Sequence, residues 1–347
     1  MLDCFYTKPI FKNFKKTQAK KYFILTYGCQ MNESDSERIG FYLEKKAYKP
    51  AKSEKQADLV ILNICSVRQS AVNRIYSKIN KLKTIKTKPK IFITGCVLDK
   101  DKKKFKILGA SYKKFGQIAM KKDCKHKIGY VPIMRGCNNF CSYCVVPYTR
   151  GREFSRSPNT ILREVRELLK QGHTEIVLLG QNVNSYLFKK TDFSNLLKLI
   201  NNISGDFKIR FLTNHPKDMS DKLINTISKC EKIIKEIHLP VQSGDNKILR
   251  AMNRKYTKEH YLNLIKKIRK KIPNIKFTTD VIVGFPGETK AQFQNTADLV
   301  KKVKFTNAYI AKYSPRPETT AFNLDNNISH KEKKRREKIL RKIVFKK

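Results

Sequence analysis

The chain has 347 residues, with 75 Lys or Arg against 29 Asp or Glu, so its formal net charge is +46. This length predicts about two domains, and an apolar content of 40% is enough to build buried cores. The absence of any long apolar run argues against a membrane span. Residues 1–21 hold no apolar segment typical of a signal peptide, so we expect a cytoplasmic protein with reduced thiols.

The charge leaves two interpretations open. A strongly basic chain predicts a polyanionic partner, most plainly a nucleic acid. The same composition, rich in Lys, Asn and Ile and without Trp, is also what an AT-rich genome imposes on every protein that it encodes.

Three strand-like runs in the first third of the chain each end at a cysteine. The runs are residues 22–28, 58–64 and 90–95, and they lead into Cys29, Cys65 and Cys96. Their continuous apolar character is typical of buried parallel strands, and helix-like stretches at 34–46 and 67–83 separate them. Because parallel strands end at one edge of a sheet, the three cysteines should converge. One such cysteine alone is best explained as a buried structural thiol, but three predict a three-thiolate site.

A second set of cysteines lies at residues 137–144, which read Cys-Asn-Asn-Phe-Cys-Ser-Tyr-Cys. A closed 4Fe-4S cluster needs four thiolates, so Cys137, Cys141 and Cys144 would leave one iron free to bind another ligand. Zinc sites use four ligands, often in C-x2-C pairs, and the nearest histidine here is His126. Nine cysteines is an odd number, which does not favour a disulfide framework. The C-x3-C-x2-C spacing, with Tyr143 before its last cysteine, resembles the signature of radical S-adenosylmethionine enzymes.

Six further strand candidates alternate with helical runs. The strands are residues 129–135, 175–179, 207–213, 237–241, 276–283 and 307–313. The helices are 159–171, 193–203, 219–228, 257–272 and 289–303. Six β-α steps predict a partial, open (β/α)6 barrel, whose chemistry sits at the C-terminal ends of its strands. We therefore expect an α/β protein in three parts: a three-layer parallel-sheet domain (1–126), a barrel domain (127–317) and a solvated basic tail (318–347).

The motifs resemble those of the methylthiotransferases, a family within the radical S-adenosylmethionine superfamily. The matching segments include Thr-Tyr-Gly-Cys-Gln-Met-Asn at 26–32, Cys-Ser-Val-Arg at 65–68, Leu-Gly-Gln-Asn-Val at 179–183 and Val-Gly-Phe-Pro-Gly-Glu-Thr at 283–289. The resemblance covers residues 22–345. The residues after the first two cysteines, together with 181–183, resemble the branch that acts on N6-dimethylallyladenosine beside the tRNA anticodon.

This resemblance implies two 4Fe-4S clusters and two molecules of S-adenosyl-L-methionine. The cluster on Cys137, Cys141 and Cys144 would bind S-adenosylmethionine and generate a 5′-deoxyadenosyl radical, a step that the cofactor carries. The cluster on Cys29, Cys65 and Cys96 would present the sulfur. Candidate cofactor contacts are Tyr143, Gly180, Gln181 and Asn182. A packing aromatic is an equal explanation for Tyr143, and a tight turn explains Gly180 by itself.

Candidate contacts to tRNA phosphates are Arg150, Arg152 and Arg156, although a surface charge run explains any one of them equally well. His215 and His238 are expected to be structural histidines. The sequence identifies neither the sulfur donor nor the electron donor, and we expect a monomer.

The chain departs from the family pattern in two places. The interval from Cys96 to Cys137 is short, so we expect the first domain to lack a strand or helix between residues 98 and 126. The chain also stops about where the family's small RNA-binding β-barrel, called TRAM, would begin, and we expect the basic tail partly to replace it. Two alternatives remain: a methylthiotransferase acting on threonylcarbamoyladenosine in tRNA or on a ribosomal protein, and a zinc-containing RNA-binding protein.

Overall fold

The structure is a computed structural model that describes residues 20–115 and 127–345. These two segments form two compact units, each described here by itself. In the described part of the chain, no helix combines the length and apolar character needed to cross a membrane.

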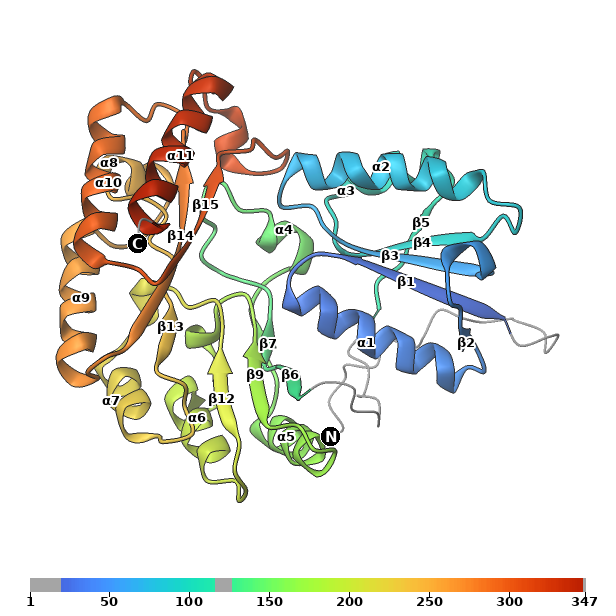
Figure 1. Cartoon of the computed structure of the whole chain (residues 1–347), viewed down its shortest axis with the longest axis horizontal. Helices are drawn as coiled ribbons and strands as arrows, with labels where there is room; N and C mark the ends of the chain where they lie inside the picture. The colour runs from blue at the N-terminus through green and yellow to red at the C-terminus, as the bar shows by residue number, and fades with distance from the viewer. Residues whose placement is uncertain (1–19, 116–126, 346–347) are drawn as a thin grey trace. The chain divides into compact units, whose positions relative to one another are not determined.

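The first unit, residues 20–115, is built around a five-stranded parallel sheet (Figure 1). The strand order is β2 (Lys49–Pro50), β1 (Lys21–Tyr27), β3 (Leu59–Cys65), β4 (Lys90–Cys96) and β5 (Ser111–Tyr112). Helix α1 (Gln30–Lys45) lies on one face, and α2 (Gln69–Lys83) and α3 (Asp99–Ile107) lie on the other. The predicted three-layer parallel architecture is confirmed.

Alternation along the central strands explains the two cores. Leu59 and Ile61 of β3 pack with α1, whereas Val60, Leu62 and Ile64 pack with α2 and α3. Both faces of β3 are therefore covered, which is why its sequence reads as an unbroken apolar run rather than as an alternation. Because β3 and β4 pair in register at their last residues, Cys65 lies directly beside Cys96.

The second unit, residues 127–345, contains six parallel strands in two groups of three (Figure 1). The first group is β6 (Ile128–Pro132), β9 (Glu175–Leu179) and β12 (Lys208–Phe211). The second is β13 (Glu236–His238), β14 (Lys276–Val283) and β15 (Asn307–Lys312). An isolated parallel bridge between Ile209 and Ile233 joins the two groups. The predicted partial barrel is confirmed.

Helices connect these strands and cover the outer face of the curved sheet. They are α5 (Pro158–Lys170), α6 (Phe193–Asn201), α7 (Asp221–Lys229), α9 (Lys258–Lys271) and α10 (Lys290–Val303). Two short helices were not predicted, α4 (Val146–Arg150) after the cysteine motif and α8 (Asn246–Ala251) after β13. Both lie within the long connections that follow these strands.

The last helix, α11 (His330–Phe345), corrects the expectation of a solvated tail. It packs on β15 and α10, and its Lys333, Arg336 and Leu340 are buried. Arg336 Nη1 pairs with the buried carboxylate of Glu288 at 2.6 Å. The prediction failed because two of the three buried side chains, Lys333 and Arg336, are basic, so the buried face of the helix reads as charged in the sequence.

The interval before the cysteine motif holds more structure than expected. Helix α3 and strand β5 lie between residues 98 and 115 and extend the sheet by one strand. The expectation of a missing strand or helix also covers residues 116–126, and for them it stays a prediction because they lie outside the described residues.

Candidate active site

Three cysteines of the second unit, Cys137, Cys141 and Cys144, lie in the loop that follows β6 and β7 (Met134–Arg135). Gly136 precedes Cys137 with φ +77°, and a Cβ there would lie 2.0 Å from the backbone oxygen of Arg152. Its backbone N–H donates to Oε1 of Gln181 at 2.6 Å. The end of β9 is thereby tied to the start of the cysteine loop, so Gln181 orients that loop.

Two backbone N–H groups of this loop favour ionisation of its thiols. The N–H of Asn139 acts to lower the pKa of Cys137, and the N–H of Val146 acts to lower the pKa of Cys144. The Asn139 side chain adds a contact of 3.4 Å to Cys137 Sγ. Hydrogen-bond donors aimed at sulfur favour the thiolate, the form that binds metal.

Burial opposes ionisation of these thiols in the free protein. Burial raises the pKa of Cys137, and it raises the pKa of Cys144 to about 12, with the neighbouring Cys141 contributing. Three clustered thiolates therefore need a cationic partner to coexist, which is what an iron–sulfur cluster provides. The residues present fit such a group.

Unpartnered hydrogen-bond acceptors lie just beyond the C-terminal ends of four barrel strands. Asn182 follows β9, Asn214 follows β12, Gln242 follows β13 and Glu288 follows β14. Each is at least nine-tenths buried, and each has a side-chain oxygen without a hydrogen-bond partner. Because buried polar atoms are almost always paired in proteins, four such oxygens at one edge indicate a ligand that brings N–H or O–H donors.

The amide orientation of two of these residues is fixed by their other bonds. Asn182 Nδ2 donates to Asp218 at 2.7 Å, and Asn214 Nδ2 donates to the carbonyl of His238 at 2.9 Å. Since both nitrogens are occupied, the oxygens are the atoms left for a ligand. Sequence reasoning singled out Asn182 but not Asn214, Gln242 or Glu288, although all four stand in strand-end motifs.

In the first unit, the cysteines lie at the ends of three strands, as the β-α-β order predicts. Cys29 follows β1 and is exposed, whereas Cys65 and Cys96 end β3 and β4. A hydrogen bond with Cys96 raises the pKa of Cys65, burial adds to it, and the charge of Cys29 acts in the same direction. The three thiols are therefore close enough to influence one another, and the backbone N–H of Val67 acts in the opposite direction, to lower the pKa of Cys65.

Two fully buried asparagines connect these three strand ends. Asn32 Oδ1 accepts from the Cys29 backbone N–H at 3.3 Å and lies 3.5 Å from its sulfur. Its Nδ2 donates to Asn63 Oδ1 at 2.8 Å and to the Ile64 carbonyl at 3.1 Å. Asn63 returns a bond of 2.7 Å from its Nδ2 to the Asn32 carbonyl.

The same pair explains the glycine before Cys96. Gly95 has φ +95°, and a Cβ there would lie 2.6 Å from Asn63 Oδ1 and 2.8 Å from Asn32 Nδ2. The amide pair thus contacts the chain at or next to each of the three cysteines. Sequence reasoning did not assign Asn63, although an asparagine inside a buried apolar strand was the available signal.

No three His, Cys, Asp or Glu side chains of the described residues approach closely enough to hold a single metal ion. A single zinc ion needs its sulfur ligands within about 2.3 Å of one point. Each thiolate of an iron–sulfur cluster binds a separate iron, so cluster ligands need not come so close.

The predicted RNA contacts differ in exposure. Arg152 is exposed and lies over the Phe140 ring at 4.3 Å, and Arg150 is half-buried at the end of α4. Arg156 contradicts the prediction: it is buried, it pairs with Glu164 at 2.6 Å, and its Nη1 donates to the Pro132 carbonyl. Its guanidinium therefore holds α5 against β6.

The remaining predicted residues have structural contacts. Tyr143 packs on a core cluster that includes Met252, Phe285 and Tyr313, and burial raises the pKa of its hydroxyl. Gly180 has no room for a side chain, because a Cβ would lie 2.7 Å from Met134. Burial lowers the pKa of His215 to about 2, so this ring is neutral at physiological pH.

One residue near the cysteines was missed altogether. Arg254 is buried, and its Nη1 lies 3.5 Å from Cys141 Sγ. Nothing in the local sequence distinguishes it from the many other basic residues.

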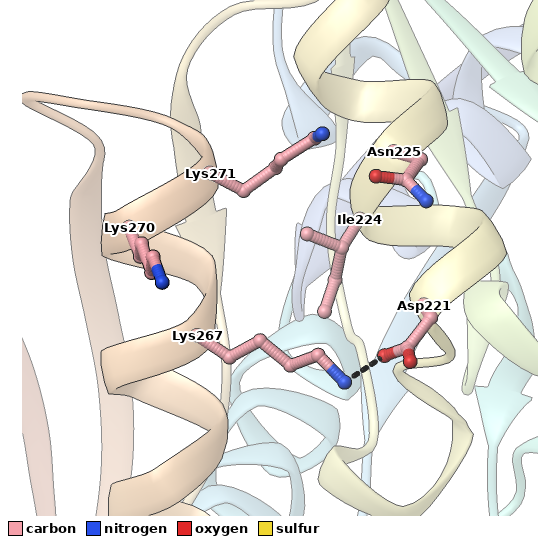
Figure 2. Close-up of a pocket in the computed structure, with 6 residues that line it drawn as sticks. All are labelled: Asp221, Ile224, Asn225, Lys267, Lys270 and Lys271. Carbon is pink, nitrogen blue, oxygen red and sulfur yellow. Dashed lines mark ion pairs between the residues drawn. The ribbon is translucent and has the colours of Figure 1, made fainter.

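A separate cavity of about 280 Å³ lies between α7 and α9 (Figure 2). Its lining residues are Asp221, Ile224, Asn225, Lys267, Lys270 and Lys271. Lys267 reaches across it to Asp221 at 2.5 Å. None of the cysteines or strand-end acceptors lines it, so this cavity is not the candidate active site.

Comparison with known proteins agrees with both units. Residues 131–300 match the radical SAM superfamily, and residues 21–113 match "Uncharacterized protein family UPF0004". A protein of Alkaliphilus oremlandii named tRNA-2-methylthio-N(6)-dimethylallyladenosine synthase is 42% identical over 94% of this chain and 78% of its own length. A protein of the same name from Carboxydothermus hydrogenoformans is 43% identical over 91% of this chain and 81% of its own length.

Among solved structures, the radical S-adenosylmethionine methyltransferase TsrM of Kitasatospora setae is similar in fold. Its TM-score is 0.65 at 11% identity, covering 88% of this chain and 77% of that one.

Proposed function

This chain belongs to the tRNA-2-methylthio-N(6)-dimethylallyladenosine synthase family, and we propose that it places a methylthio group on carbon 2 of N6-dimethylallyladenosine in tRNA. It is a radical S-adenosylmethionine enzyme that uses two 4Fe-4S clusters. When bound, the clusters and two molecules of S-adenosylmethionine supply the hydrogen abstraction, the sulfur and the methyl group.

The observation that carries the proposal is the presence of a three-thiolate site in each unit, at the C-terminal ends of parallel strands. The cysteines at 137, 141 and 144 hold the cluster that binds S-adenosylmethionine. Those at 29, 65 and 96 hold the cluster that presents sulfur. Three thiolates in each place leave one iron available to a further ligand.

We assign the unpartnered acceptors of the barrel to S-adenosylmethionine. Its α-ammonium group and ribose hydroxyls bring the donors that the oxygens of Asn182, Asn214, Gln242 and Glu288 lack. Gln181 accepts a hydrogen bond from Gly136 through its Oε1, and we assign it the role of positioning the cysteine loop for the cofactor.

For the RNA, Arg152 is the strongest of the three predicted arginines, because it is exposed and its guanidinium is already stacked on Phe140. Arginine and aromatic faces together suit both phosphates and unstacked bases. We propose that the enzyme meets tRNA in the cytoplasm as a monomer.

The test is nucleoside mass spectrometry of tRNA from cells that lack the gene, with and without complementation. The proposal expects the 2-methylthio derivative to disappear, unmodified dimethylallyladenosine to accumulate, and complementation to restore the product. An unchanged nucleoside profile would refute it.

A pair of variants tests the two sites. Cys137→Ala should abolish cleavage of S-adenosylmethionine, whereas Cys29→Ala should retain cleavage and lose thiolation. Equal loss of both activities in the Cys29→Ala variant would contradict the division of labour between the sites. About eight iron atoms per chain with little zinc are expected for two clusters, and stoichiometric zinc would favour the zinc-containing RNA-binding alternative.

A further inference from the structure

We propose that Arg254 is a positioning residue that supplies a fixed positive charge to the cluster held by Cys137, Cys141 and Cys144, and that it raises the reduction potential of that cluster. The inference rests on the proposed function, since it requires that cluster.

The guanidinium of Arg254 is held from three directions. Nη1 lies 3.5 Å from Cys141 Sγ, Nη2 donates to the Pro240 carbonyl at 2.8 Å, and Nε donates to the Tyr256 hydroxyl at 2.8 Å. Tyr256 is fixed in turn, because its hydroxyl donates to the carbonyl of Val241 at 2.9 Å. The charge therefore stands beside the middle cysteine in one defined orientation.

No carboxylate among the described residues forms an ion pair with Arg254, although its side chain is buried. Arginine keeps its proton at any physiological pH, and a buried charge is costly without a partner of opposite sign. The groups around it are uncharged or are thiols: the hydroxyls of Tyr143 and Tyr256 have raised pKa values because they are buried, and His215 is neutral.

Arg210 provides a comparison, because carboxylates balance the charge of its side chain. It lies in β12 and pairs with Glu175 and Glu236, the first residues of β9 and β13, at 2.7 and 2.8 Å. Arg254 lies close to the strands' opposite ends, and the anionic groups that the described residues offer beside it would be the thiolates. The missing counter-charge is therefore supplied by the iron-bound thiolate site.

A fixed cation affects the two oxidation states of such a site unequally. One-electron reduction adds a negative charge, which the nearby guanidinium stabilises, so the potential rises. Hydrogen bonds to ligand sulfur act in the same direction, and Nη1 is placed to make one with Cys141.

The experiment measures the midpoint potential of this cluster. The background is Cys29→Ala, Cys65→Ala and Cys96→Ala in the full chain, so that one cluster contributes to a dithionite titration followed by electron paramagnetic resonance. Arg254→Met is compared with Arg254→Lys, and Arg210→Met is the matched control. Iron content and binding of S-adenosylmethionine are measured on each variant.

We expect Arg254→Met to disfavour reduction at least tenfold, a shift of 59 mV to more negative potential for one electron. Arg254→Lys should recover at least half of that shift, and Arg210→Met should leave the potential unchanged. If Arg254→Met retains no iron, Arg254→Gln against Arg254→Lys gives the same comparison of neutral and charged side chains.

An unchanged potential in Arg254→Met would overturn the inference. An unchanged potential together with weakened binding of S-adenosylmethionine would assign the arginine to the ligand and would equally overturn it. Failure of the parent chain to assemble a cluster would instead refute the proposed function.

Discussion

Removing the Asn63 side chain should loosen the sheet edge that carries the first three cysteines. Asn63→Ala deletes three hydrogen bonds made by a fully buried side chain: Asn32 Nδ2 to Asn63 Oδ1, and Asn63 Nδ2 to the Asn32 carbonyl and to Ser36 Oγ. At about 1 kcal/mol for each bond, the loss is about 3 kcal/mol of local stability. The two Asn32 groups each lose a partner, although Nδ2 keeps the Ile64 carbonyl.

Hydrogen–deuterium exchange of the metal-free full chain measures this loss where it should occur. Amides of β3 and β4 are expected to exchange on the order of a hundredfold faster, because 3 kcal/mol is about two powers of ten in the opening equilibrium. Asn184→Ala is the matched control: it removes a buried asparagine of the other unit, which bonds to the backbone of His215 at both its oxygen and its nitrogen.

The same variant should impair cluster assembly in the first unit. In a background of Cys137→Ala, Cys141→Ala and Cys144→Ala, Asn63→Ala should bind less than half of the roughly four iron atoms of one cluster. Replacing both buried asparagines by leucine, which has nearly the same shape, should restore much of the stability, since losing both partners orphans fewer groups. It should not restore the iron. Full iron binding in that double variant, or exchange in β3 and β4 accelerated less than threefold in Asn63→Ala, would refute the reasoning.

Three further predictions concern the barrel unit. The pKa of His215 is lowered in the folded protein, so below pH 6.5 the unfolded chain binds a proton that the folded chain does not, and stability decreases as the pH is lowered. At pH 5.5 the free energy of unfolding should be about 1.4 kcal/mol lower than at high pH. Urea unfolding should show this decrease in the parent and not in His215→Gln. Arg336→Met should lower the free energy of unfolding by about 3–5 kcal/mol, because it leaves the Glu288 carboxylate buried without its partner. Thermal unfolding should show that adding Glu288→Gln restores more than half of the lost stability. Lys334, Lys338 and Lys342 are exposed along α11, so changing all three to Gln should lower the salt slope of tRNA binding by about 2–3, measured by filter binding between 50 and 300 mM salt. A slope within 0.5 of the parent would exclude α11 from the RNA contact. A His215→Gln variant with the pH dependence of the parent would refute the first prediction, and an Arg336→Met variant as stable as the parent would refute the second.

The apolar runs of the sequence located strands in both units. The continuous run at 58–64 became β3, which is buried on both faces, whereas β14 occupies the predicted residues 276–283 and fully buries alternate side chains. Helix α1 begins at Gln30, four residues earlier than predicted, because Cys29 and Asn32 form its capping box. A cysteine is not an ordinary capping residue, so propensity alone could not place that start.

The site residues also divide into those that the sequence could predict and those that it could not. The six cysteines could be predicted because their spacing and their positions at strand ends are local properties of the chain. Arg254 could not, because Cys141 lies more than a hundred residues before it and only the fold brings the two together. The prediction for Arg156 as an RNA contact was wrong. Its position in a basic run gives no sign that its guanidinium pairs with Glu164, two turns into the following helix.

The two thiolate sites are built with different electrostatics, and that difference bears on their proposed roles. In the first unit, neutral amides hold the strand ends, and Cys29 is exposed to solvent. In the second, the buried guanidinium of Arg254 lies beside Cys141, and the side-chain amide and carboxylate oxygens at the strand ends have no hydrogen-bond donor. A neutral network orders thiolates without favouring an added electron, whereas a buried cation favours it. Under the proposed roles, the chain's own charges would favour reduction in the second unit, where we propose that S-adenosylmethionine is cleaved, and would leave the first suited to holding sulfur.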